Sequence, residues 1–250
     1  MKESAVFSRI REENSSYDGS DRATIGSIGI KTIVLAALAI ASGVLTAMYV
    51  PRAFESEDKL MYLVLILIAS SIVSLISYFL GRFVESISHV CSIIYSLAEG
   101  VSLGFITAIA ELYVPGVGYA ALGATLIIFL VVTVLFRAGV IKAGRTAFAI
   151  MIALLISAVL LSIMTVVIAF VGNYTEYISI SILVEVIMLL FATISLVFNF
   201  QEATFIVEAG CSKQAEWSVA LGLMVTLVYI YLRVLRILLY VARIVANSRN

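Results

Sequence analysis

Residues 217–240 read WSVALGLMVTLVYIYLRVLRILLY, and this stretch decides the fold. It is long enough to cross a bilayer, because about 20 apolar residues in a helix span a hydrocarbon core of roughly 30 Å. Two arginines, Arg233 and Arg236, lie inside the apolar run. On a helical projection they share an arc of roughly 100° with three small or polar residues, Ser218, Gly222 and Thr226. We expect this stripe to face other helices, a water-filled cavity or the interface, since lipid does not solvate it. The alternative is that the arginines extend to the head groups, as long cations near helix ends do.

The composition is that of an integral membrane protein. Hydrophobic residues make up 62% of the 250-residue chain and charged residues 13%, and the mean hydropathy is +1.13. Soluble domains are nearer ~45–50% apolar and ~25% charged. The lipid bilayer is therefore the expected partner, and a net charge of zero gives no reason to expect nucleic acid. The two cysteines, Cys91 and Cys211, do not make a disulfide framework.

Seven apolar runs follow one another with short connections, and none alternates with the period of a barrel strand. We predict an all-α, polytopic membrane protein: a seven-helix bundle over residues 30–243 with the last helix at its centre. Residues 1–29 are expected to form a polar, flexible tail, and 244–250 a C-terminal tail. The sixth run is expected to continue as a helix toward Gly210. The runs are 30–49, 61–81, 90–110, 119–136, 147–171, 178–199 and 217–240.

The distribution of Lys and Arg predicts the orientation. With seven spans, ten of these residues fall on the side of the N-terminus and six on the other side. The N-terminus is therefore expected in the cytoplasm. The C-terminal arginines conflict with this orientation, and the conflict would disappear if one run did not span.

The third run carries a carboxylate near its middle, Glu99, on a face with Ser92, Ser96 and Ser102. A GxxxG pair, Gly100 and Gly104, lies beside that face. A carboxylate at this depth must be protonated, paired or hydrated. Two interpretations stay open: a neutral Glu99 bonded to a neighbouring helix, or a group that handles protons or cations.

The other candidates for an ion pathway are Thr226 of the last run and three residues of the sixth run and its extension. Glu185 and Asn199 share a face but lie about four turns, or ~21 Å, apart. Glu202 follows one turn after Asn199. We expect Arg233 and Arg236 to serve as a structural ion pair or latch, with Arg233 bonded to Glu185, Glu202 or Glu99, because an unpaired guanidinium costs at least ~2.5 kcal/mol inside a membrane.

Four stretches resemble the Bax inhibitor-1 family, in its bacterial, YccA-like branch. The resemblance covers most of residues 30–240 and is strongest from residue 194 onward. It implies a seven-helix bundle with a central last helix, a pH-sensitive calcium leak and a link to stress survival. The stretches are IYSLAEGVSLGFI (94–106), FRAGVIK (136–142), ISLVFNFQEATFIVEAG (194–210) and EWSVALGLMVTLVYIYLRVLRIL (216–238).

The chain departs from that family at the acidic pair that shares a proton and gates the pore. Asn199 stands at the sixth-helix position and Thr226 at the seventh-helix position, and neither side chain titrates. Arg233 stands where many relatives of this branch have Glu, and Arg236 matches an arginine of the family. The resemblance therefore implies the fold without the aspartate switch. A calcium ion would have to use other oxygens, those of Glu99, Glu185, Glu202 and Asn199, although calcium takes ~6–8 oxygen ligands.

Three classes of function remain. The first is a cation, above all calcium, leak channel or transporter. The second is a non-conducting scaffold or stress-response regulator of other membrane proteins. An intramembrane enzyme is the third, and we expect none, because the sequence has no metalloprotease HExxH and no phosphate-binding GxxxxGK[ST].

Overall fold

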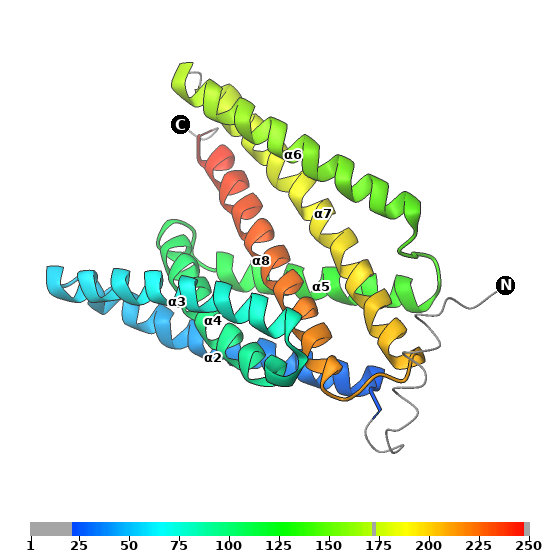
Figure 1. The fold of residues 1–250 in the computed structure, drawn as a ribbon. Helices are drawn as coiled ribbons and strands as arrows, with labels where there is room; N and C mark the ends of the chain where they lie inside the picture. The colour runs from blue at the N-terminus through cyan, green and yellow to red at the C-terminus, as the bar shows by residue number, and fades with distance from the viewer. Residues whose placement is uncertain (1–21, 172–173, 248–250) are drawn as a thin grey trace. The chain divides into compact units, whose positions relative to one another are not determined.

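The structure is a computed structural model that describes residues 22–171 and 174–247, with side chains described for 22–166 and 180–246. Seven helices in these ranges are long and apolar enough to cross a membrane, which confirms the all-α, polytopic fold (Figure 1). A single 3-10 turn, η2 (Glu85–Ile87), joins the second helix to the third. The helices are α2 (Ile25–Ala53), α3 (Glu57–Phe83), α4 (Ser88–Tyr113), α5 (Val117–Arg137), α6 (Arg145–Val171), α7 (Tyr174–Glu208) and α8 (Ala215–Asn247).

Both ends of the helical region extend beyond the predicted bounds. Helix α2 begins at Ile25 rather than near residue 30, and Thr24 caps it by accepting a hydrogen bond from the Ser27 backbone N–H. The stretch IGSIG at its start has too little apolar periodicity to be recognised as helix. Helix α8 runs to Asn247, past the expected end at residue 243. Most of the predicted N-terminal tail, residues 1–21, lies outside the described residues.

The predicted extension of the sixth run toward Gly210 is confirmed. Helix α7 is continuous over 35 residues, which corresponds to about 52 Å. Gly210 has a φ of 69°, and its N–H bonds to the Val207 carbonyl while the Cys211 N–H bonds to the Ile206 carbonyl. This pair of bonds is a Schellman motif, in which glycine adopts the left-handed conformation and closes the helix.

The chain forms two compact units. The first comprises the residues up to Ile106 together with Asn199–Val225, and the second comprises Thr107–Phe198 together with the residues from Thr226 onward. Three helices, α4, α7 and α8, therefore begin in one unit and end in the other (Figure 1). These are the three helices that carry the polar side chains singled out from the sequence.

Helix α8 is the most buried span among the described helices. Half of its most apolar 18-residue window is buried, against 28% or less in each of the other spans. In the first unit, the Ser92 hydroxyl of α4 lies 3.4 Å from the Trp217 carbonyl of α8. In the second unit, the Thr107 hydroxyl of α4 lies 2.6 Å from the Tyr231 hydroxyl of α8. Helix α8 therefore contacts α4 in both units, through residues that lie outside the polar stripe.

Small residues allow helices of the first unit to pack closely. A Cβ added to Gly100 or Gly104 of α4 would overlap the backbone carbonyl of Ala39 or Gly43 on α2. The GxxxG pair therefore lies at a helix–helix contact, as its spacing predicts. On α3, a Cβ at Gly81 would lie 2.8 Å from a methyl group of Leu221 on α8.

Candidate functional site

A polar cluster lies among α3, α7 and α8 in the first unit. The Arg82 guanidinium, at the end of α3, donates to the Glu202 carboxylate of α7 at 2.6 Å. Its other terminal nitrogen lies 3.3 Å from the Ser218 carbonyl of α8. The Ser218 hydroxyl donates in turn to the Arg82 carbonyl at 3.4 Å. Arg82 thus connects three helices through one ion pair and two weaker hydrogen bonds.

Asn199 lies one turn before Glu202 on α7 and belongs to the same cluster. Its amide nitrogen donates to the Gly222 carbonyl of α8 at 3.2 Å. A Cβ at Gly222 would lie 3.3 Å from the Asn199 amide oxygen and 3.6 Å from the Arg82 guanidinium. A side chain at this position would have to displace the Asn199 amide by a few tenths of an ångström. The sixth-helix position of the expected acidic pair is therefore occupied by a neutral amide that is bonded to α8.

Glu99 lies in the same unit but contacts a different helix. The Ser74 hydroxyl of α3, which donates to the Ser71 carbonyl at 3.1 Å, faces the Glu99 carboxylate. Ser96, one turn earlier on α4, is fully buried, and its hydroxyl has no hydrogen-bond partner among the described residues. One turn beyond Glu99, the Ser102 hydroxyl lies 3.4 Å from that of Ser70. A row of hydroxyl groups between α3 and α4 therefore flanks Glu99.

The second unit contains the buried ion pair that the α8 stripe predicts. Arg233 donates to one oxygen of Glu185 at 2.8 Å, and Arg236 donates to the other at 3.2 Å. The side chains of Arg233 and Glu185 are 15% and 8% exposed, whereas that of Arg236 is 50% exposed. The Arg233 guanidinium also lies 4.5 Å from the centre of the Tyr229 ring, within the range of a cation–π contact. Of the three acids considered as partners for Arg233, the structure selects Glu185.

The remaining candidate, Thr226, is buried, with 8% of its surface exposed. The second unit begins on α8 at Thr226. The α7 segment that belongs to the first unit begins at Asn199. The candidates from the sequence thus fall into three groups rather than one: Asn199 with Glu202, Glu99 alone, and Glu185 with the two arginines.

Two charged contacts of the first unit were not anticipated. One is the ion pair of Arg82, a charge that directly follows the second apolar run, with Glu202. Glu216, with no exposed side-chain surface, accepts from the Thr24 N–H at 2.7 Å and from the Ser27 hydroxyl at 2.5 Å, and it pairs with Lys31. The sequence offered one indication of these contacts, the position of the charges. Lys31, Arg82 and Glu216 each lie within two residues of the end of an apolar run.

The described residues contain no cluster suited to a resident metal ion. No group of three or more His, Cys, Asp or Glu side chains lies together in the described part of the chain. The stretch GVSLG (100–104) has the spacing of a nucleophile elbow, but it lies within helix α4, and both glycines pack on α2. A nucleophile elbow requires a sharp strand-to-helix turn, so this serine lacks that context.

Comparison with known families places this site in context. The model of the family described as "Bax inhibitor 1 like" matches residues 4–243, nearly the whole chain. The class defined by the fold and the match is a polytopic helical membrane protein, and the chain belongs to the Bax inhibitor-1 family. No curated protein and no solved structure matches it.

Proposed function

We propose that this protein is a non-enzymatic cation leak, of calcium above all, whose closed state is held by the ion pair of Arg82 and Glu202. The observation that carries the proposal is the 2.6 Å contact between these two side chains in the membrane-embedded first unit. The pair joins α3 to α7, and the Ser218 carbonyl adds α8. A cation that passes between these helices must displace the guanidinium, so the pair is both a barrier and a latch.

The chemistry of the cluster favours a leak without the shared-proton switch of the family. An amide at position 199 carries no charge at any physiological pH, so it cannot share a proton with a second carboxylate. Glu202 beside Arg82 is the one acid of this cluster. Glu99, flanked by the hydroxyl groups of α3 and α4, is the second acid that we assign to the path through the first unit. Flux should therefore increase with pH as one group, the Glu99 carboxylate, ionises.

Calcium would be cargo rather than a resident ligand. Calcium takes ~6–8 oxygen ligands in tight sites, and the described residues provide no cluster of three acids. A sparse set of carboxylate, hydroxyl and carbonyl oxygens favours weak binding and passage. We place the protein in a bacterial inner membrane with its N-terminus in the cytoplasm, on the basis of the Lys and Arg distribution.

A non-conducting scaffold is the second candidate. The observation that favours it is that arginines already neutralise two of the candidate acids, Glu185 and Glu202. In that case the ion pairs fix the helices for contact with other membrane proteins. Flux measurements separate the two functions.

The test is calcium and potassium flux in proteoliposomes from pH ~6 to ~8. Glu202→Gln removes the partner of Arg82, and we expect a several-fold higher flux because the latch is weakened. Glu99→Gln should lower flux and abolish its increase with pH. Glu208→Gln, an exposed position on the same helix, is the matched control and should behave like wild type. Flux no higher than that of empty liposomes for every variant would reject the leak and favour the scaffold.

A further inference from the structure

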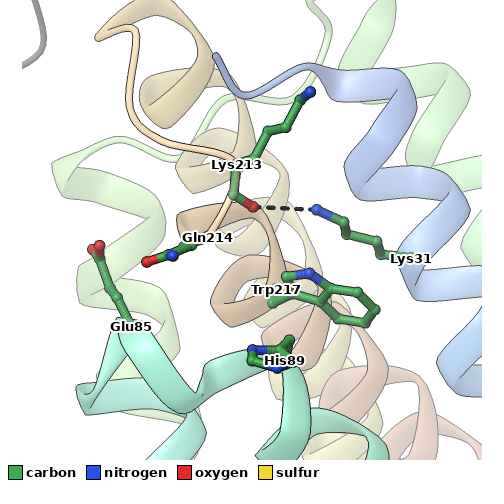
Figure 2. Close-up of a pocket in the computed structure, with 6 residues that line it drawn as sticks. All are labelled: Lys31, Glu85, His89, Lys213, Gln214 and Trp217. Atoms are coloured by element: carbon green, nitrogen blue, oxygen red, sulfur yellow. Dashed lines mark hydrogen bonds between the residues drawn. The ribbon is translucent and has the colours of Figure 1, made fainter. Parts of the chain in front are cut away.

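A pocket of about 230 Å³ lies in the first unit, and neither Arg82 nor Glu202 is among its lining residues, so the proposed function does not use it. Helix ends and connections form it: the start of α2, η2 with the start of α4, and the α7–α8 connection with the start of α8. Figure 2 shows the six side chains that line it, Lys31, Glu85, His89, Lys213, Gln214 and Trp217.

The pocket lies at the level where the apolar spans begin. Lys31, Arg82 and His89 directly adjoin uncharged stretches of α2, α3 and α4, at residues 32–51, 60–81 and 90–98. Trp217 similarly precedes an uncharged stretch that ends at residue 232. Lysine, histidine and tryptophan at the ends of apolar spans are typical of the head-group region of a bilayer. A ligand of this pocket is therefore within reach of lipid head groups.

The side chains that line the pocket include hydrogen-bond donors and one carboxylate acceptor, a combination that suits a zwitterion. The Lys31 ammonium bonds to the Lys213 carbonyl at 3.2 Å, pairs with Glu216 and lies 5.0 Å from the centre of the Trp217 ring, and it brings a positive charge to the pocket lining. Trp217 and His89 lie next to it, and the Glu85 carboxylate and the Gln214 amide lie on the opposite side (Figure 2). The carboxylate suits a primary ammonium group, and the N–H donors suit a phosphate.

Apolar surface next to the pocket provides a place for acyl chains. Phe83, at the end of α3, is 77% exposed, and Val84 and Ile87 are also exposed. All three lie within two residues of Glu85 in the sequence. The acyl chains of a lipid whose head group enters the pocket can therefore pack against them. A soluble phosphate compound has no acyl chains that could contact this surface.

We infer that this pocket binds the head group of phosphatidylethanolamine, with the ammonium on Glu85 and the phosphate near Lys31 and His89. The shared chemistry is a phosphodiester joined to a primary ammonium, and the exposed apolar residues indicate the lipid as its source. Phosphatidylcholine has no N–H to donate to Glu85, and phosphatidylglycerol has no cation. Both should therefore bind more weakly.

The chain supplies its own reporter, because Trp217 is its single tryptophan. Intrinsic fluorescence of the full chain in detergent is titrated with short-chain phosphatidylethanolamine, phosphatidylcholine and phosphatidylglycerol. A fourth titration uses soluble glycerophosphoethanolamine. We expect a saturable change with phosphatidylethanolamine, and affinities at least several-fold lower for the other three.

Variants then test the assigned contact. Glu85→Gln should weaken binding of phosphatidylethanolamine roughly tenfold, the usual effect of losing a charged hydrogen bond. Glu57→Gln, exposed at the other end of α3, is the matched control and should bind like wild type, with circular dichroism to verify that both variants fold. Equal affinity for phosphatidylcholine, or no effect of Glu85→Gln, would overturn the assignment. Equal affinity for glycerophosphoethanolamine would overturn the lipid as the source of the head group.

Discussion

At the scale of single residues, two arginines share one carboxylate but differ in their surroundings. Arg233 is largely buried beside Tyr229 and lies 2.8 Å from Glu185, whereas half of the Arg236 side chain is exposed. A buried charge that loses its partner keeps its desolvation cost, while an exposed pair contributes little. The two positions therefore form a matched pair for mutation.

We expect Arg233→Leu to lower the free energy of unfolding by at least about 2 kcal/mol, because Arg236 replaces only part of the lost interaction with Glu185. Arg236→Leu should cost less than about 1 kcal/mol. The measurement is the thermal midpoint in detergent, where the first change corresponds to a decrease of about 4–8 °C. Equal midpoints for Arg233→Leu and wild type would show that the guanidinium reaches the head groups instead.

At the scale of helices, glycine positions show which surfaces of a span touch another backbone. A Cβ at Gly104 of α4 would meet the Gly43 carbonyl of α2, an atom that cannot move without shifting the helix. A Cβ at Gly123, inside α5, would meet nothing within 4 Å. The same substitution should therefore have opposite effects at the two sites.

Gly104→Ala is expected to destabilise the protein by about 1–3 kcal/mol through overpacking. Gly123→Ala should be neutral or stabilise by up to about 1 kcal/mol, since alanine loses less conformational entropy in a helix than glycine. Denaturation of both variants in the same detergent provides the comparison. If Gly104→Ala were as stable as Gly123→Ala, close α2–α4 packing would be rejected.

At the scale of the whole molecule, the seven candidate spans of the described residues predict that the start of α2 and the end of α8 lie on opposite sides of the membrane. The Lys and Arg count predicts a cytoplasmic N-terminus, and the C-terminal arginines were the conflict. Arg233 and Arg236 bond to Glu185 of α7. Lys31 and Arg82, on the opposite side of the count, likewise bond to acids, so the orientation stays a prediction.

Cysteine labelling tests this orientation. In a background of Cys91→Ser and Cys211→Ser, Lys213→Cys lies in the α7–α8 connection and Tyr113→Cys lies at the exposed end of α4. We expect a membrane-impermeant maleimide, added outside intact cells, to label Tyr113→Cys and to leave Lys213→Cys unlabelled. The reverse pattern would place the N-terminus outside.

The sequence by itself determined the seven spans, the continuation of α7 to its glycine cap and the polar stripe of α8. These features depend on apolar length, on helical periodicity and on the left-handed conformation at Gly210, all of which are local. The stripe also required a buried partner for Arg233, which limited the candidates to three acids.

Only the tertiary structure decided which charges meet. Arg82 and Glu202 are 120 positions apart, Lys31 and Glu216 are 185 apart, and Glu185 and Arg233 are 48 apart. Periodicity assigns a residue to a face of its own helix, but it does not determine the rotation of that helix or which neighbour the face meets. Side-chain packing against adjacent helices fixes both, so the ion pair of Arg82 with Glu202 and that of Arg233 with Glu185 emerge only when the helices are packed.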